Sequence, residues 1–214
     1  MNNTPWTLHD RIFSEVHMYN FMDRTSKALG LEQTQAALPL MKKYHDGQTR
    51  KGSEHIPYIY HPLLMACHAC ALGLKEDELL AGILLHDVCE DCGLTPEELP
   101  VSERVRKTVM LLTYTQLPGE TEEDAHKRYY GEIKKDRLAT ITKVLDRVNN
   151  VSTMMNCFGR ERMIEYIEET EKYVLPLLEE LKFGYNKKYY DTAFLLKYHL
   201  LSIIDNDKHA LSLL

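Results

Sequence analysis

Several features are scarce or missing in this sequence of 214 residues, and each absence excludes a class of protein. No uninterrupted apolar run approaches the roughly 18 residues of a transmembrane helix, so we expect no membrane-spanning segment. Lysine and arginine total 26 against 32 acidic residues, and the net charge of −6 disfavours a broad surface for nucleic acid or anionic membrane. The N-terminal residues lack the basic and apolar parts of a signal peptide, so a cytoplasmic location is expected.

Cysteine is sparse and odd in number. Five cysteines without an export signal are most simply reduced thiols. The pairs Cys67-x-x-Cys70 and Cys89-x-x-Cys92 are spaced as in a zinc ribbon, but both fall on or near apolar helical stretches, where residues three apart share a face. Ribbon cysteines lie on tight turns, so we interpret this spacing as a coincidence.

Internal repeats and linkers rich in Pro, Gly or Ser are also missing, so a single domain over residues 1–214 is expected. An apolar content of 44% supports one substantial core. Period-two alternation is rare, whereas apolar residues recur at helical spacing through most of the chain. The fold class is therefore predicted to be all-α, a bundle of roughly nine helices.

Proline, glycine and apolar spacing predict the helix boundaries. His61-Pro62 opens a helix that Gly73 closes, and Lys75 to Val88 forms the next, whose nearly continuous apolar residues indicate a central position. A polar stretch around Pro118 that includes a run of acids is predicted to be a long loop. Further helices are expected near 102–112, from 136 to a stop at 159, at about 160–182 and 188–205, and within 1–40.

The densest group of reactive side chains is the run His86-Asp87-Val88-Cys89-Glu90-Asp91, at the end of the most apolar helix. At about 100° per residue, one imidazole and three carboxylates share a single arc of such a helix. Like charges that close together on a mostly buried helix require a neutralising cation, and a divalent metal held by His86 and Asp87 would provide it. A solvated helix end with clustered acids is the alternative.

Two more residues are candidates to complete such a centre. His61 opens the preceding helix, and Asp146 lies opposite the apolar stripe of its own helix, on a face whose small and polar residues suit a cleft wall. Taken singly, a histidine at a helix start is more often a cap, and a mid-helix aspartate is more often half of a surface ion pair. The spacing alone leaves both interpretations open.

Together these motifs resemble a known family. The pattern of His61-Pro62, His86-Asp87 and Asp146 resembles that of HD-domain metal-dependent phosphohydrolases, and more narrowly the hydrolase domain of the RelA/SpoT homologues and small alarmone hydrolases. The matching segments are His45-Asp46-Gly47-Gln48, Arg50-Lys51, Pro57-Tyr58-Ile59-Tyr60-His61-Pro62, Leu84-Leu85-His86-Asp87-Val88-Cys89-Glu90-Asp91, Lys143-Val144-Leu145-Asp146-Arg147-Val148-Asn149-Asn150, and Glu169-Thr170 with Tyr173 and Pro176. The resemblance runs over about 41–180, and leaves 1–40 and 185–214 as helical extensions.

The resemblance implies an HD-domain helical bundle with one divalent metal. It assigns the metal to His61, His86, Asp87 and Asp146, the attacking water and its proton to Glu90 and Asp91, and the nucleotide to Arg50, Lys51 and Asn150. A ligand set of two histidines and two aspartates favours Mn²⁺, with Fe²⁺ or Zn²⁺ as alternatives. A guanidinium next to an ammonium group suits a guanine face and a phosphate.

The activity that the resemblance implies is removal of the 3′-pyrophosphate from guanosine tetra- or pentaphosphate, a small-molecule substrate. The length leaves no room for the synthetase half of the long family members, so a purely degradative activity is expected. One position departs from the family: Ser152 stands where an arginine is usual, which removes a phosphate contact. A hydrolase of another nucleotide, such as a dinucleotide 2′-phosphate, and a nucleotide sensor without turnover are the alternatives. The sequence carries no signal for an oligomeric state.

A basic and aromatic stretch contains Tyr129 and Tyr130, beside His126, Lys127 and Arg128. We interpret this stretch as solvated surface, because runs of charged residues are usually exposed. A wall that faces the nucleotide is the alternative interpretation.

Overall fold

The structure is a computed structural model that describes residues 14–51 and 56–212. In these two ranges the single β pairing is an isolated bridge between Thr49 and Pro57, and the all-α prediction is confirmed. The α-helices are α2 (Glu15–Leu29), α3 (Glu32–Tyr44), α4 (Tyr60–Ala71), α5 (Asp77–Leu85), α6 (Val88–Cys92), α7 (Glu103–Leu112), α8 (Glu122–Lys134), α9 (Arg137–Val151), α10 (Arg160–Glu169), α11 (Leu175–Phe183) and α12 (Tyr190–Ser212). Among the described residues, no helix is long and apolar enough to cross a membrane.

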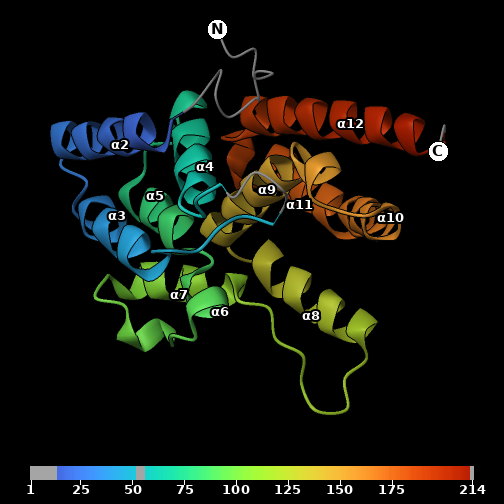
Figure 1. Ribbon diagram of the computed structural model, residues 1–214, viewed down its shortest axis with the longest axis horizontal. Coiled ribbons are helices and arrows are strands. Elements are labelled where there is room, and N and C mark those ends of the chain that lie inside the picture. The colour runs from blue at the N-terminus through green and yellow to red at the C-terminus, as the bar shows by residue number, and fades with distance from the viewer. Residues whose placement is uncertain (1–13, 52–55, 213–214) are drawn as a thin grey trace, which may run out of the picture.

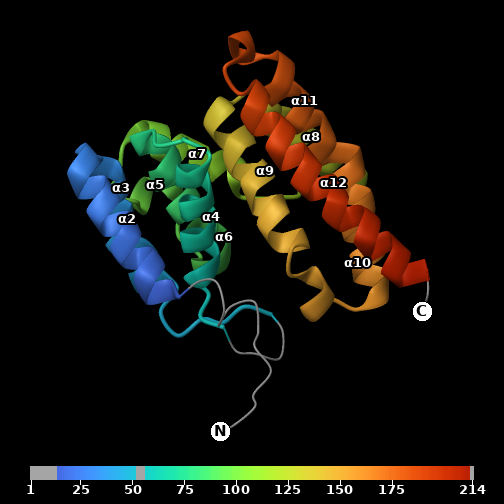
Figure 2. The ribbon, with the colours of Figure 1, turned by 90° about the horizontal axis from the view of Figure 1, so that it is seen from above.

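The helices form two groups that meet along α9. Figure 2 shows α2 to α7 on one side and α9 to α12 on the other. Helix α9 contacts α4, α5 and α7 of the first group, and it also packs against α8, α11 and α12. A polar residue on α9 that faces the first group therefore lies where the two groups join.

Helix α5 is the buried centre of the first group. Each residue from Leu79 to Leu85 is buried, as its apolar composition predicts. The Asp77 carboxylate accepts the backbone N–H groups of Gln33 (2.9 Å) and Thr34 (2.7 Å), so it caps the first turn of α3. A Cβ atom on Gly82 would lie 3.1 Å from a methyl carbon of Thr108, so glycine allows α5 and α7 to approach closely.

The predicted helix from Lys75 to Val88 is wrong in one respect that matters for chemistry. Helix α5 ends at Leu85, and α6 begins at Val88 after a turn at His86 and Asp87. The backbone of Asp87, with φ of −96° and ψ of −7°, departs from helical values and interrupts the ladder of hydrogen bonds. Glu90 and Asp91 therefore belong to a separate short helix.

The long loop around Pro118 is shorter than predicted. Helix α8 occupies Glu122–Lys134, and the three acidic residues of its first turn stabilise the positive end of the helix dipole. The hydroxyl of Thr121 accepts the N–H of Asp124 (3.2 Å) and caps the helix. Tyr129 and Tyr130 of this helix are buried, so their interpretation as solvated surface is wrong.

The later helices also differ at their ends. Helix α9 ends at Val151 and not at 159, because the Ser152 hydroxyl donates to the Val148 carbonyl (2.7 Å) and a 3₁₀ turn follows. The predicted helix over 160–182 is α10 and α11 joined by a π-helical turn at Thr170–Val174. Helix α12 extends past the predicted end at 205. Helices α2 and α3 confirm helical structure in 1–40, of which residues 1–13 lie outside the described residues.

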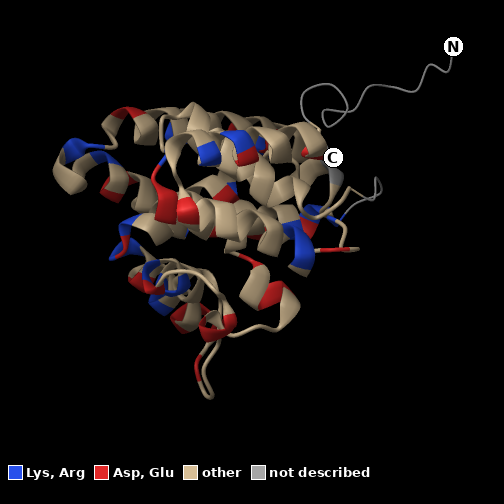
Figure 3. Ribbon diagram, turned by 90° about the vertical axis from the view of Figure 1, so that its left-hand side faces the viewer, with Lys and Arg blue, Asp and Glu red and all other residues tan. Residues whose placement is uncertain are grey.

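Charged positions are mixed over the described part of the chain. Figure 3 shows Lys and Arg positions interspersed with Asp and Glu positions on the ribbon. Many of them form pairs across helices, such as Arg104 with Asp136 (2.8 Å). Because charges of both signs alternate in this way, a charged ligand would have to bind at a local cluster of residues.

Candidate functional site

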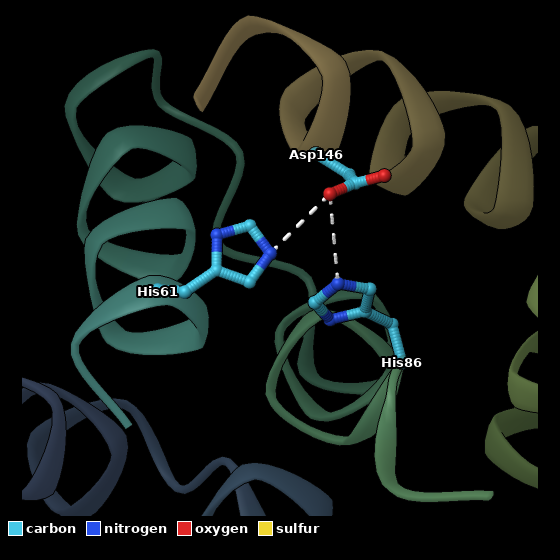
Figure 4. Close-up of side chains that lie close together, drawn as sticks. All are labelled: His61, His86 and Asp146. Carbon is cyan, nitrogen blue, oxygen red and sulfur yellow. Dashed lines mark ion pairs between the residues drawn. The ribbon is translucent and has the colours of Figure 1, made fainter. Parts of the chain in front are cut away.

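Three buried side chains from three helical segments converge where the two groups of helices meet. His61 comes from the first turn of α4, His86 from the turn after α5, and Asp146 from the middle of α9 (Figure 4). The Nε2 atoms of His61 and His86 lie 3.3 Å and 3.9 Å from Oδ1 of Asp146. The ligand atoms of all three lie within 4.8 Å of one another, which is close enough to hold one metal ion.

The other nitrogen of each histidine is already occupied. His61 Nδ1 lies 2.5 Å from the Oδ1 atom of Asn149, and His86 Nδ1 lies 2.8 Å from the Ile83 carbonyl oxygen. Both acceptors assign a hydrogen to Nδ1, so each ring, when neutral, directs the lone pair of Nε2 into the centre. Both Nε2 atoms are buried without a hydrogen-bond partner. Buried polar atoms are rarely left in that state, so the pair fits a bound cation.

Asp87 adds a second carboxylate to this centre. Its Oδ2 atom lies 3.0 Å from His86 Nε2 and 3.6 Å from His61 Nε2. The same oxygen accepts a hydrogen bond from the Tyr58 hydroxyl at 2.6 Å. The four ligands predicted from the motif therefore lie together, although they come from positions as distant as 61 and 146.

The electrostatics of the centre favour a cation. Burial lowers the pKa of His61, whereas Asp87 and Asp146 overcome the effect of burial on His86 and raise its pKa to about 9. Burial alone would raise the pKa of Asp87, but the neighbouring His86 lowers it, and Lys143 likewise holds the pKa of Asp146 well below its usual value. The two ionised carboxylates therefore favour positive charge at His86, and a divalent ion held by the carboxylates and two neutral imidazoles would satisfy the same preference.

Asp146 is held by hydrogen bonds from two side chains of its own helix. Its Oδ1 atom accepts the side-chain amide of Asn150 (2.6 Å), and its Oδ2 atom accepts the ammonium group of Lys143 (3.0 Å). Lys143 is mostly buried and lies over the ring of Tyr129, 5.4 Å from its centroid. One oxygen of Asp146 is thus held by the lysine, while the other faces the histidines.

A cleft of about 730 Å³ opens in front of the centre. It is lined by every remaining residue that the sequence analysis selected: Arg50, Lys51, Glu90, Asp91 and Asn150. Glu90 accepts the backbone N–H of Tyr114 (3.1 Å) from the opposite wall. The structure therefore brings all nine predicted site residues to one cleft and its floor.

The sequence analysis missed several residues of this site. Tyr58, Lys143 and Asn149 lie within the quoted motifs, but no role was assigned to them because each acts through a contact between distant segments. Tyr114 and Tyr129 form an aromatic wall of the cleft together with His126, 5.2 Å from Tyr114 between ring centroids. The placement of Tyr129 favours the alternative interpretation, in which this stretch faces the cleft.

Comparison with known proteins adds independent findings. No family model matches the chain. The solved structure of a metazoan ortholog of SpoT, described as hydrolyzing ppGpp, superimposes with a TM-score of 0.62 at 19% identity, covering 80% of this chain and 93% of that one. Fold and site together define an all-α bundle of the HD type with a histidine–aspartate centre.

Curated relatives identify the family. The guanosine-3′,5′-bis(diphosphate) 3′-pyrophosphohydrolase of Aquifex aeolicus is 33% identical over 155 residues, which is 70% of this chain and 22% of that protein. The bifunctional (p)ppGpp synthase/hydrolase SpoT of Escherichia coli is 30% identical over 71% of this chain and 22% of its own length. The GTP pyrophosphokinase of Streptomyces coelicolor is 30% identical over 78% and 20%. The chain belongs to the family of RelA/SpoT homologues, and it spans about a fifth of the length of these relatives.

Proposed function

We propose that the protein is a metal-dependent hydrolase that removes the 3′-pyrophosphate of guanosine tetra- or pentaphosphate. The observation that carries this proposal is the pair of buried histidines whose Nε2 atoms lack partners and converge on Asp146 at the floor of a large cleft. Relatives named as 3′-pyrophosphohydrolases, and the metazoan ortholog described as hydrolyzing ppGpp, support this substrate.

The metal would be held by His61, His86, Asp87 and Asp146. The donor chemistry fits Mn²⁺, Fe²⁺ or Zn²⁺, and we propose Mn²⁺ because two carboxylates accompany two imidazoles. When bound, such an ion supplies Lewis acidity to water and phosphate oxygens. Asn149 and the Ile83 carbonyl hold the imidazole rings in the orientation that this ligand set requires.

Glu90 and Asp91 are proposed to handle the proton of the attacking water. Both line the cleft, and partial desolvation raises the pKa of the Glu90 carboxyl, which suits a group that accepts a proton and returns it. In the reaction, the water oxygen bonds to the phosphorus next to the ribose and the bond from that phosphorus to the 3′-oxygen breaks. The proton taken from the water goes to the departing ribose oxygen, which balances the step.

Arg50, Lys51 and Asn150 are proposed to bind the nucleotide. Arg50 lies at the cleft rim with one guanidinium nitrogen 2.6 Å from the Oδ1 atom of Asn150, so two of these side chains are already held together. Cations at this position would offset the carboxylates of the cleft when a substrate with several phosphates approaches. The Ser152 hydroxyl donates to the Val148 carbonyl of α9, so we assign the phosphate contacts to Arg50 and Lys51.

Product analysis tests the proposal. Protein freed of metal and then supplied with Mn²⁺ should release one pyrophosphate per guanosine tetraphosphate and leave guanosine diphosphate. A parallel panel should include a dinucleotide 2′-phosphate. Turnover of the dinucleotide alone would refute the proposed substrate but keep the metal chemistry, while metal binding without any turnover would identify a nucleotide sensor.

A further inference from the structure

A continuous chain of contacts joins the two carboxylates of the metal centre through the nucleotide-binding residues. Asp146 Oδ1 accepts the side-chain amide of Asn150, whose own oxygen accepts a guanidinium N–H of Arg50, both at 2.6 Å. Arg50 in turn lies over the ring of Tyr58, 5.7 Å from its centroid, and the Tyr58 hydroxyl donates to Asp87 at 2.6 Å. In this chain of contacts, Tyr58 connects Arg50 with Asp87.

The position of Tyr58 is fixed on several sides. It lies in the turn that leads into α4, where its backbone N–H donates to the Gln48 carbonyl (2.9 Å). Its ring stacks on His45, with centroids 4.6 Å apart and planes inclined by 25°. Contacts with His45 and Arg50 restrain the ring, so the hydroxyl has little freedom to leave the carboxylate that it contacts.

The hydroxyl contacts the atom of Asp87 that matters for the centre. Oδ2 is the Asp87 oxygen that faces both imidazoles, at 3.0 Å and 3.6 Å from the Nε2 atoms of His86 and His61. A hydrogen bond to that oxygen selects one orientation of the carboxylate.

We propose that Tyr58 is a positioning residue that aims the Asp87 carboxylate and links it to the nucleotide-binding Arg50. The inference rests on the proposed function for its kinetic part, since it assumes that Arg50 meets the substrate. Two separate parts of one side chain perform the two tasks. The hydroxyl orients Asp87, and the ring supports the Arg50 guanidinium.

Two substitutions separate these tasks. Tyr58→Phe keeps the ring and removes the hydroxyl, so kcat should fall about 10- to 100-fold while KM stays within about twofold of wild type. Tyr58→Leu also removes the ring, and KM should then rise about two- to fivefold further. Tyr198→Phe, which removes an exposed hydroxyl on α12, is the matched control and should change neither constant.

Metal binding gives a readout that does not depend on the substrate. Titration of metal-free protein with Mn²⁺ should show a dissociation constant about tenfold higher in Tyr58→Phe than in wild type or Tyr198→Phe. Wild-type protein that binds Mn²⁺ but releases no pyrophosphate would refute the proposed substrate, while the shift in Mn²⁺ affinity would still support the role of Tyr58. A Phe variant with wild-type affinity and kcat would overturn the inference. A loss that only follows a lower melting temperature would mean that the hydroxyl is structural, and would overturn it as well.

Discussion

Two consecutive residues of α9 take part in two buried polar clusters that differ in one respect. Arg147 belongs to a cluster in which α9 meets the end of α10 and the π-helical turn that follows it. Its terminal nitrogens donate to Glu169 (2.5 Å), to the hydroxyls of Tyr130 (2.9 Å) and Thr170 (3.0 Å), and to the backbone carbonyl of Tyr166 (3.2 Å). Its guanidinium lies 3.8 Å from the centroid of the Tyr166 ring. Asp146 belongs to the histidine centre on the other side.

The difference concerns which charges find partners. In the arginine cluster, the guanidinium is matched by the Glu169 carboxylate, and of its nitrogens only Nε, which does not reach the carboxylate, lacks a hydrogen-bond partner. In the histidine centre, Lys143 pairs with Asp146 but not with Asp87, and the Nε2 atoms of both histidines lack a hydrogen-bond partner. A cluster whose polar groups are matched stabilises the fold by itself, whereas buried imidazole nitrogens without partners beside two carboxylates suit a bound cation. Of these two adjacent residues, Arg147 thus contributes to the stability of the fold and Asp146 to the proposed metal site.

The largest effect is expected from breaking the histidine centre. Asp87→Ala removes one ligand and should lower both Mn²⁺ binding and pyrophosphate release by about 10³-fold or more, because the ligand set becomes incomplete. Elemental analysis and product assays measure both. The melting temperature of the metal-free protein should change little. A variant that keeps its metal and its activity would show that Asp87 is not a ligand.

Breaking the arginine cluster should lower the stability of the fold but leave metal binding intact. Arg147→Met leaves the mostly buried Glu169 carboxylate without a cation and should lower the free energy of unfolding by about 3–5 kcal/mol, measured by denaturant titration. The double variant Arg147→Met with Glu169→Leu should recover most of that loss, because no charge is then left unpaired. Below its melting temperature, the single variant should still bind Mn²⁺. Loss of metal with unchanged stability would contradict the division of roles.

A third substitution sharpens the comparison within the cleft. Glu90→Gln keeps the shape of the side chain but cannot accept the proton of water, so kcat should fall about 10²-fold while Mn²⁺ affinity is retained. Asp87→Ala, which is expected to lose both turnover and Mn²⁺ binding, serves as the comparison. If Glu90→Gln loses metal to the same degree, Glu90 is a ligand and its assignment to proton transfer is wrong.

The smallest effect expected is a pH dependence of stability. Burial would raise the pKa of Glu169, but the Arg147 guanidinium and the Tyr130 hydroxyl hold it below its usual value. The lowered pKa means that the stabilisation is complete above the pKa of an unfolded glutamate and is lost as the pH falls through the lower folded value. Unfolding experiments on the metal-free protein should show this acid loss in wild type. The Arg147→Met, Glu169→Leu variant should show less of it, and an identical pH profile would contradict the pairing.

Much of the fold and the ligand set could be predicted from the sequence because the signals are local. The buried helix α5 follows from its apolar run, and His61 and His86 lie next to features that mark helix ends. Helix α8 was missed although its signal is also local: Thr121 is followed three residues later by Asp124, a helix start that a run of acids obscured.

Contacts between distant segments could not be predicted in the same way. Asn149 holds His61 across 88 positions and Tyr58 reaches Asp87 across 29, and no spacing rule connects residues that far apart. The break between α5 and α6 depends on the backbone at Asp87, a residue whose environment is set by its tertiary neighbours. The sequence identified the reactive side chains, but not the side chains that orient them.

The central claim is that the centre formed by His61, His86, Asp87 and Asp146 holds a divalent ion, while the neighbouring arginine cluster does not. X-ray diffraction from crystals soaked in Mn²⁺, with data recorded near the manganese absorption edge, tests it most directly. We predict one anomalous peak per chain, between the two Nε2 atoms and the Asp146 carboxylate. Ordered ligand side chains without such a peak, or a peak elsewhere in the molecule, would contradict the account.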